Sequence, residues 1–434
     1  MGDRTAHPPA IVLGADTPIG LTVIRDLGEH GVPVHAIARS RKGIALYSRW
    51  TTRGYLRPPD DDGTIELLNL VAAQQGARYL LAVSERDLLF IRAAADGGRL
   101  VGLQALVPPA AQLAIVGDKG ATYAVAREVG VPVPTTWQPP DGTIADQSPD
   151  ELTFPCVLKW SNPESVGREL SGHGLELLKS EYCYDRAELV RALARYAPYG
   201  RYPLVQAFCP GSGLGHMIFL DRGEALLRLQ HRRISEWPPE GGTSTVCESL
   251  PLSINAGLLA KSEALLRRIG WRGAAMVEYR LDPRTGRAAL MEVNGRFWGS
   301  LPLAYHAGVP FAWYTYAVLG LGVRPDPPPY RAGVRCRYMI PETRRLLTLM
   351  RQRGHTQNRE LSFSVVRELI EYVRQFFSPS SRYFVFTFHD PRPFFADMGF
   401  VIRNAIRRIA ARWRRSDDNQ HDRPAPAPDG RGPS

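Results

Sequence analysis

Long apolar segments are absent from this chain of 434 residues. No run of eighteen apolar residues occurs anywhere in it, whereas a membrane-spanning helix needs about 20. The N-terminal stretch MGDRTAHPPAIVLGAD also lacks a charged start followed by a long apolar core, which is the pattern of a secretory signal. We therefore expect a cytoplasmic protein without a membrane span.

Cysteine is scarce and scattered. The five cysteines form no C-x-x-C pair, which a zinc ribbon would need, and their spacing does not indicate a disulfide framework. We expect reduced, structural thiols at Cys156, Cys183, Cys209, Cys247 and Cys336.

Lysine is rare, since only five of the 54 basic residues are not arginine: Lys42, Lys119, Lys159, Lys179 and Lys261. A lysine in so arginine-rich a chain is a candidate for chemistry that needs a compact ammonium on a flexible stem. The basic charge itself is uneven. Residues 331–416 contain 18 Arg, no Lys and 6 acidic residues, which is +12, so the rest of the +11 chain sums to −1.

The N-terminal part has the pattern of a doubly wound α/β domain. Apolar segments at 9–13 and 32–38 predict buried strands on either side of a helix at 21–30, and a further strand follows at 79–83. We assign this domain to residues 1–107.

A glycine turn follows the first of these strands. It contains only Gly14 and Gly20, so the G-x-G-x-x-G fingerprint of an NAD(P) site is incomplete. A strand-to-helix turn that needs small residues is the preferred interpretation.

The rest of the chain divides at a proline cluster. Strands and helices mix without strict alternation in 108–325, which predicts an α+β domain of two lobes. Residues 326–416 form a basic, mainly helical extension, and 417–434 are predicted to be disordered. On a helix, 401–415 would place apolar side chains along one side among arginines, a pattern that fits either an anionic membrane surface or docking on the protein itself.

The strongest local signal is a predicted hairpin at Ala275–Arg296. If its turn centres between Arg284 and Thr285, Glu278 faces Glu292, and Asn294 projects on the same face as Glu292. Like charges opposed across strands are destabilising, and a hard cation such as Mg²⁺ takes oxygen ligands of this kind. The alternative is a pair of solvent-facing glutamates, held apart or paired with arginine.

Three of the five lysines lie in the same central region. Lys119 opens a helix, Lys159 ends an apolar strand, and Lys179 follows a glycine-containing loop. That loop, with Ser171, Gly172 and Gly174, could turn its amides toward an anion. These groups predict a phosphate site beside the metal.

Residues 108–320 resemble the ATP-grasp superfamily, specifically its carboxylate–amine ligase branch, and the preceding α/β unit resembles the domain usual before it. The resemblance is carried by an ordered series of segments: DK at 118–119, GVPVP at 130–134, VLK at 157–159, LVQAFCPG at 204–211, HRRISEWPPEGGTSTVCES at 231–249, VEYRLD at 277–282 and MEVNGRFWGS at 291–300. The chain departs from the family at Ala207, where many relatives have Glu, and at Gly295, where Pro is common.

The resemblance implies a set of roles. ATP would lie between two lobes with Lys119, Lys159 and Lys179 toward its phosphates. Its adenine would contact the main chain of Gln206, Ala207, Phe208 and Cys209. The metal ligands Glu278, Glu292 and Asn294 would hold Mg²⁺, usually as two ions and with Mn²⁺ as a substitute, and Arg296 with Lys179 would meet the transferred phosphoryl group.

The implied reaction joins a small-molecule carboxylate to an amine through an acyl phosphate, with release of ADP and phosphate. Arg232, Arg233, Thr243 and Ser244 are candidates for holding the acceptor carboxylate, although the arginines could equally be paired with Glu236 or Glu240. A second hypothesis is a nucleotide-binding adaptor that docks on a membrane or nucleic acid through its basic C-terminal region. We favour the ligase and do not expect nucleic acid as a partner, and the oligomeric state stays open.

Overall fold

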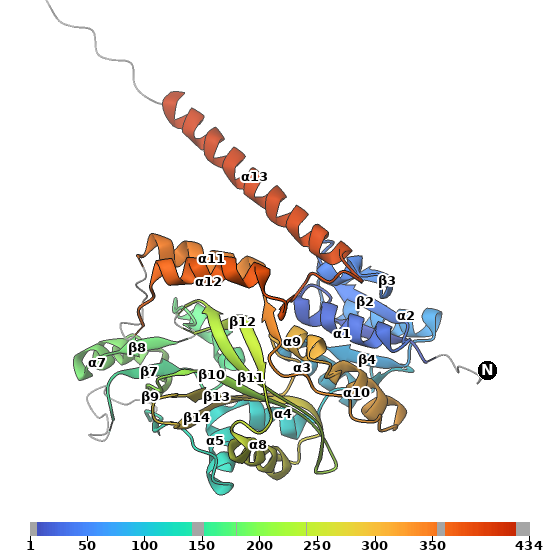
Figure 1. Ribbon diagram of the computed structural model, residues 1–434, viewed down its shortest axis with the longest axis horizontal. Helices are drawn as coiled ribbons and strands as arrows, with labels where there is room; N and C mark the ends of the chain where they lie inside the picture. The colour runs from blue at the N-terminus through green and yellow to red at the C-terminus, as the bar shows by residue number, and fades with distance from the viewer. Residues whose placement is uncertain (1–6, 141–151, 179, 240, 354–360, 422–434) are drawn as a thin grey trace, which may run out of the picture.

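Three β-sheets and the helices that cover them make up the protein in this computed structural model (Figure 1). The structure describes residues 7–140, 152–178, 180–239, 241–353 and 361–421. The first sheet is parallel, and the other two are mainly antiparallel. The fold is therefore α/β plus α+β, as the sequence predicts.

The first sheet has the strand order β3-β2-β1-β4-β5. Because the order reverses beside β1, the sheet is doubly wound. Its elements are β1 (Ala10–Leu13), α1 (Pro18–Glu29), β2 (Val34–Ala38), the short helix η1 (Ile44–Tyr47), β3 (Thr51–Leu56), α2 (Asp61–Gln75), β4 (Tyr79–Ala82), α3 (Glu85–Asp96) and β5 (Gln104–Ala105).

Close packing in the turn from β1 to α1 explains why glycines occur there. The Thr17 side chain caps α1 by accepting a hydrogen bond from the Gly20 amide at 3.2 Å. A Cβ atom added at Gly20 would lie 2.2 Å from the Gly14 carbonyl oxygen. The spacing of these glycines therefore follows from the turn itself.

The second and third sheets carry the central region. The third sheet has the order β6-β9-β7-β8, and the second has the order β14-β13-β10-β11-β12-β15-β16. Their elements, with the helices of the region, are α4 (Ala110–Gly117), α5 (Lys119–Glu128), β6 (Thr136–Trp137), β7 (Cys156–Lys159), α6 (Pro163–Gly172), β8 (Glu181–Cys183), α7 (Arg186–Ala194), η2 (Ala197–Tyr199), β9 (Leu204–Ala207), β10 (Ser212–Asp221), β11 (Glu224–Trp237), β12 (Thr243–Leu250), α8 (Ala256–Ile269), β13 (Gly273–Leu281), β14 (Ala288–Asn294), α9 (Leu301–His306), α10 (Phe311–Tyr314) and η3 (Thr315–Leu321).

The basic extension is helical as expected, but it also completes the second sheet. It contains β15 (Arg335–Arg337), α11 (Met339–Arg351), α12 (Val365–Arg374), η4 (Gln375–Phe377), β16 (Ser381–Tyr383) and α13 (Arg392–His421). Strand β15 pairs with β12 and with β16. Helix α13 runs into the predicted tail at 417–434, and from residue 422 that tail lies outside the described residues.

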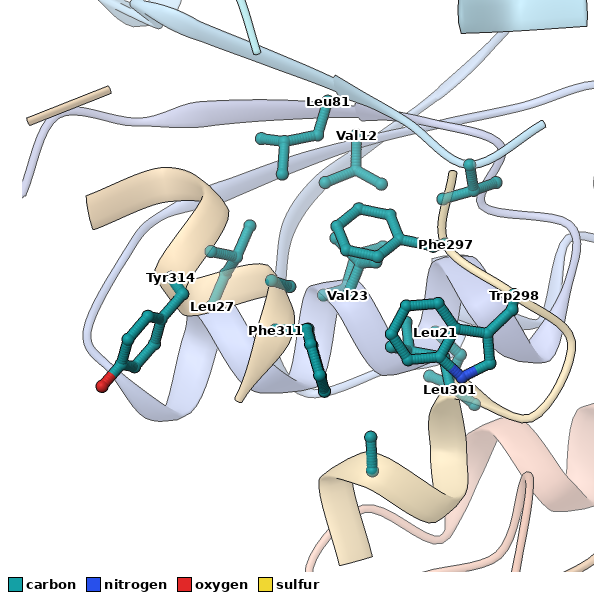
Figure 2. Close-up of a cluster of buried hydrophobic side chains, with 14 of the residues drawn as sticks. Val12, Leu21, Val23, Leu27, Leu81, Phe297, Trp298, Leu301, Phe311 and Tyr314 are labelled. Atoms are coloured by element: carbon teal, nitrogen blue, oxygen red, sulfur yellow. The ribbon is translucent and has the colours of Figure 1, made fainter. Parts of the chain in front are cut away.

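One apolar cluster joins the first sheet to the segment after β14 (Figure 2). Val12 and Leu27 come from the parallel sheet and α1, while Phe297, Trp298 and Phe311 come from the other side. Trp298 is fully buried there. The chain that leaves β14 is thus anchored against the N-terminal sheet.

Membrane crossing was tested on the helices as well. Among the described residues, none of the helices combines the length and the apolar character that a bilayer span requires.

Candidate active site

The predicted hairpin is present, and its register is the predicted one. Strands β13 and β14 are antiparallel, with Glu278 directly opposite Glu292. The Asp282 carboxylate orders the turn by accepting hydrogen bonds from the Arg284 amide at 2.9 Å and the Thr285 hydroxyl at 3.1 Å. The pairing of the two glutamates across the hairpin is confirmed.

Each of these carboxylates has a cation beside it. The Arg233 Nη2 atom lies 2.5 Å from Glu278 Oε2, and the Lys119 Nζ atom lies 3.5 Å from Glu292 Oε2. The Asn294 amide also donates to Glu292 at 3.1 Å. Burial raises the pKa of Glu292, but Lys119, Asn294 and Arg296 outweigh it and lower that pKa to about 2. Each glutamate therefore has a positive charge beside it. Two like charges that face each other across a hairpin require such compensation.

A cavity of about 350 Å³ opens beside the paired glutamates. Its polar lining includes Glu278, Glu292, Lys119 and Lys159, together with the segment 206–209 that continues from β9. The structure thus brings two of the predicted metal ligands, two of the predicted phosphate lysines and the predicted adenine segment around one space, while Asn294 contacts Glu292 from outside the lining. Lys179 lies outside the described residues.

Part of the cavity lining is apolar and partly aromatic. It is formed by Trp160, Leu177, Tyr182, Phe208 and Met291. Flat apolar groups pack well against such side chains. The cavity therefore suits a ligand with a flat apolar end and an anionic end.

Lys159 stands at the end of β7, on the cavity lining. Burial lowers the pKa of Lys159, and the nearby Lys119 ammonium lowers it further. A polyanion placed in the cavity would raise the pKa of Lys159 again, because negative charge favours the protonated form of lysine.

Arg280 and Glu236, which are not among the predicted site residues, line the same cavity. The Arg233 guanidinium donates to Glu236 at 2.7 Å and to the Gly242 carbonyl at 3.0 Å, and Arg280 lies 3.7 Å from Glu236. The signal for Arg280 was available, since it is two residues after Glu278 on one strand and so shares its face.

The four candidates for holding the acceptor carboxylate have different surroundings in the structure. Arg233 lines the cavity and is paired with Glu236, which is one of the two alternatives for this residue. Its neighbour Arg232 is half-exposed and pairs with Glu248 at 2.6 Å. In β12, Thr243 is exposed and Ser244 is buried. Among the described residues that line the cavity, Arg233 is the one member of this group.

The expected glycine loop around residue 171 is wrong, because the structure has α6 through Gly172. The Ser171 hydroxyl donates to the Gly167 carbonyl at 3.0 Å within this helix, and the Gly174 amide closes the turn on the Ser171 carbonyl at 3.1 Å. Buried Val166 and Leu170 explain the helix, since their spacing of four places both on one face. Ser171, Gly172 and Gly174 are not among the described residues that line the cavity.

Arg296 follows β14, and its charge contributes to the low pKa of Glu292. Its Nη1 atom donates to the Phe297 carbonyl at 3.1 Å. The preceding Gly295 has no room for a side chain, since an added Cβ would lie 2.5 Å from Trp271 and 2.9 Å from Val116. Close packing thus accounts for this departure from the family pattern.

The donor set fits a hard cation. Among the described residues, no group of three or more His, Cys, Asp or Glu side chains could hold a metal. What the hairpin offers is two carboxylates and one carboxamide, Glu278, Glu292 and Asn294. Mg²⁺ binds through few protein oxygens and takes its other ligands from water and phosphate, whereas zinc sites use histidine and cysteine.

Comparison with known proteins gives distant relatives. No protein-family model matches the chain. It is 26% identical over 181 residues to a D-alanine–D-alanine ligase of Acidiphilium cryptum (strain JF-5), an alignment that covers 41% of this chain and 56% of that relative. The chain spans little more than half the length of the curated relatives it matches.

Solved structures share the fold over a larger part of the chain. The biotin carboxylase domain of the Hydrogenobacter thermophilus 2-oxoglutarate carboxylase, in complex with MgADP, ADP and bicarbonate, has a TM-score of 0.58 at 18% identity and covers 76% of this chain and 74% of its own. The L-amino acid ligase from Bacillus licheniformis has a TM-score of 0.54 at 16% identity and covers 72% and 74%.

Proposed function

We propose that this chain is an ATP-grasp enzyme and acts as an ATP- and Mg²⁺-dependent carboxylate–amine ligase, a proposal supported by its likeness to a D-alanine–D-alanine ligase and to an L-amino acid ligase. The observation that supports the proposal is one cavity whose lining includes two opposed glutamates, two lysines and several apolar side chains. Residues 108–325 would bind the nucleotide, residues 1–107 would precede that unit, and 326–416 would extend it.

In the proposed reaction, the γ-phosphoryl group of ATP passes to a carboxylate oxygen of the first substrate, which gives an acyl phosphate and ADP. The amine nitrogen of the second substrate then attacks the acyl carbon. The C–O bond to phosphate breaks, the nitrogen loses a proton, and an amide and free phosphate are the products. The phosphorylation is needed because an amine does not displace hydroxide from a carboxylate at neutral pH.

The residues of this chain would bind and orient the reactants. Lys119 and Lys159 would face the phosphates, and Gln206 to Cys209 would contact the adenine. Mg²⁺, as two ions or with Mn²⁺ in its place, would be held by Glu278, Glu292 and Asn294 and would neutralise phosphate charge. A buried cation aimed at the developing charge contributes on the order of 3 kcal/mol to catalysis.

The remaining site residues keep proposed roles. Arg296, and Lys179 outside the described residues, would meet the transferred phosphoryl group. We keep Arg233 as the candidate for the acceptor carboxylate, with Arg280 beside it, because both line the cavity. Arg232, Thr243 and Ser244 would then act only at the margin of the cavity.

Turnover separates the ligase from the adaptor hypothesis. The full chain is incubated with ATP, Mg²⁺ and pooled amino acids, and ADP release is measured with and without the pool. The ligase predicts release that depends on the amino acids, and fractionation of the pool then identifies them. Binding of lipid or nucleic acid with no amino-acid-dependent release would instead favour the adaptor.

Nucleotide binding should take up protons at alkaline pH. The pKa of Lys159 is lowered in the free protein, so part of it is neutral at pH values below the ordinary lysine pKa, and bound phosphates would raise that pKa again. ATP affinity should therefore weaken as pH rises through the pKa of free Lys159. Titration calorimetry with MgATP in buffers of different ionisation enthalpy measures the uptake.

The matched control is Lys159→Arg, which keeps the positive charge but does not titrate in this range. It should bind MgATP without proton uptake. Equal uptake by this variant and the unmodified protein would show that another group takes the proton.

A further inference from the structure

Helix α12 turns an unbroken apolar stripe toward solvent. The stripe consists of Val366, Leu369, Ile370, Val373 and Phe377, whose spacing of three and four residues places them along one side. Their exposed fractions run from 43% to 83%. Single exposed apolar residues are ordinary, but a continuous exposed stripe marks an interaction surface.

The opposite side of α12 is the one that holds it to the protein. Arg345 of α11 pairs with Glu368 at 2.6 Å, the Thr343 and Tyr372 hydroxyls are hydrogen-bonded at 2.8 Å, and Arg337 donates to the Tyr372 carbonyl at 3.2 Å. The polar side therefore faces inward, and α11 and α12 lie together along one edge of the molecule (Figure 1).

The C-terminal region that contains the stripe is strongly positive. Residues 331–416 carry +12, while the rest of the chain sums to −1. Four of the six acids of this region are paired with arginine: Glu342 with Arg337, Glu368 with Arg345, Glu371 with Arg374 and Asp390 with Arg25. The excess arginine is thus left to attract an anionic partner.

We propose that the α12 stripe and the basic region around it bind the surface of an anionic lipid bilayer. A helix of ten residues is about 15 Å long, so it would lie in the plane of the interface with its apolar side in the acyl boundary and arginines at the headgroups. A second copy of the chain would bring two regions of +12 together. Nucleic acid would meet four aliphatic side chains, on which bases do not stack, and a single aromatic ring at Phe377.

The first half of α13 supports the same partner. Phe395, Ile402 and Ile406 are more than half exposed, and Arg403 and Arg407 lie between and beside them. This helix extends away from the body of the protein (Figure 1). It contains the segment 401–415, whose sequence pattern fits either a membrane surface or docking on the protein itself. The side chains of Ile409 and Trp413 lie outside those that the structure describes.

Vesicle binding tests the proposal. The full chain is sedimented with large unilamellar vesicles of phosphatidylcholine alone or of phosphatidylcholine and phosphatidylglycerol in equal parts. We expect binding to the anionic vesicles, weakened by added salt, and little binding to the neutral ones. Ile370→Glu, in the middle of the stripe, should lower the affinity about tenfold or more, because it places a carboxylate in the acyl boundary.

Val366→Glu has a matched control in Val101→Glu, because the two valines are 68% and 69% exposed and Val101 lies in the N-terminal region. Val366 stands in the first turn of α12, where an acid stabilises a helix, so weaker binding would not come from loss of the helix. Val101→Glu should bind like the unmodified chain. Equal binding to neutral and anionic vesicles, unchanged binding by both stripe variants, or dimers that Ile370→Glu dissociates would overturn the proposal.

Discussion

Replacing Glu292 by glutamine should reduce amino-acid-dependent ADP release by a factor of about 10³. The reason is the charge balance of the hairpin. Glu292 is ionised, with a pKa of about 2, and it faces Glu278 directly. Glutamine keeps the size of the side chain but removes the negative charge that would hold Mg²⁺, so the phosphates of ATP would lose their counter-ion. The fold should survive, because Lys119 and Asn294 can still contact an amide oxygen at this position.

The measurement is ADP release at saturating Mg²⁺, with the amino acids that the pooled assay selects. Glu128→Gln is the control, since Glu128 makes a surface pair with Arg268 at 2.8 Å, remote in role from the cavity. It should keep full activity. If Glu292→Gln also kept full activity, Glu292 would not hold a catalytic metal.

The hairpin could be predicted because its information is local. A Pro- and Gly-containing turn sets the register, and alternation along each strand then decides which side chains share a face. Glu278, Glu292 and Asn294 follow from that step alone. The same rule applies to Arg232 and Arg233. Neighbours on a strand point to opposite faces, so only one of the two could reach the cavity, but alternation alone does not say which.

Other parts of the site have no local signal. The cavity lining joins β7, β9, β11 and the hairpin, and side-chain spacing within one segment does not say which distant segment it meets. The three-residue strands β15 and β16 are too short to show alternation, and they form only because β12 offers an edge for β15 to pair with. The glycines of α6 predict a loop, because they interrupt the pattern in which the spacing of Val166 and Leu170 would indicate a helix.

The extension is also tied to the N-terminal sheet by one buried ion pair. Asp390 is 1% exposed and accepts from Arg25 Nε at 3.0 Å, from the Ser48 hydroxyl at 2.7 Å and from the Arg49 amide at 2.9 Å. Arg25 donates further to the Val385 carbonyl at 2.8 Å. Both charges are satisfied from segments more than 300 residues apart. This pair therefore connects the membrane-binding part that we propose to the body of the enzyme.

Asp390→Ala should destabilise the protein by about 3–5 kcal/mol, because it leaves the Arg25 guanidinium buried without its counter-ion. Asp62→Ala is the matched control: Asp62 pairs with Arg99 at 2.6 Å, but its side chain is 79% exposed, so the same substitution should cost less than about 1 kcal/mol. Urea unfolding compares the two. Digestion by trypsin shows where the protein is loosened, because the arginine-rich extension should be released faster in Asp390→Ala alone. Equal costs for the two variants would mean that Arg25 finds another partner or water, and that the extension is held by its apolar contacts with the body.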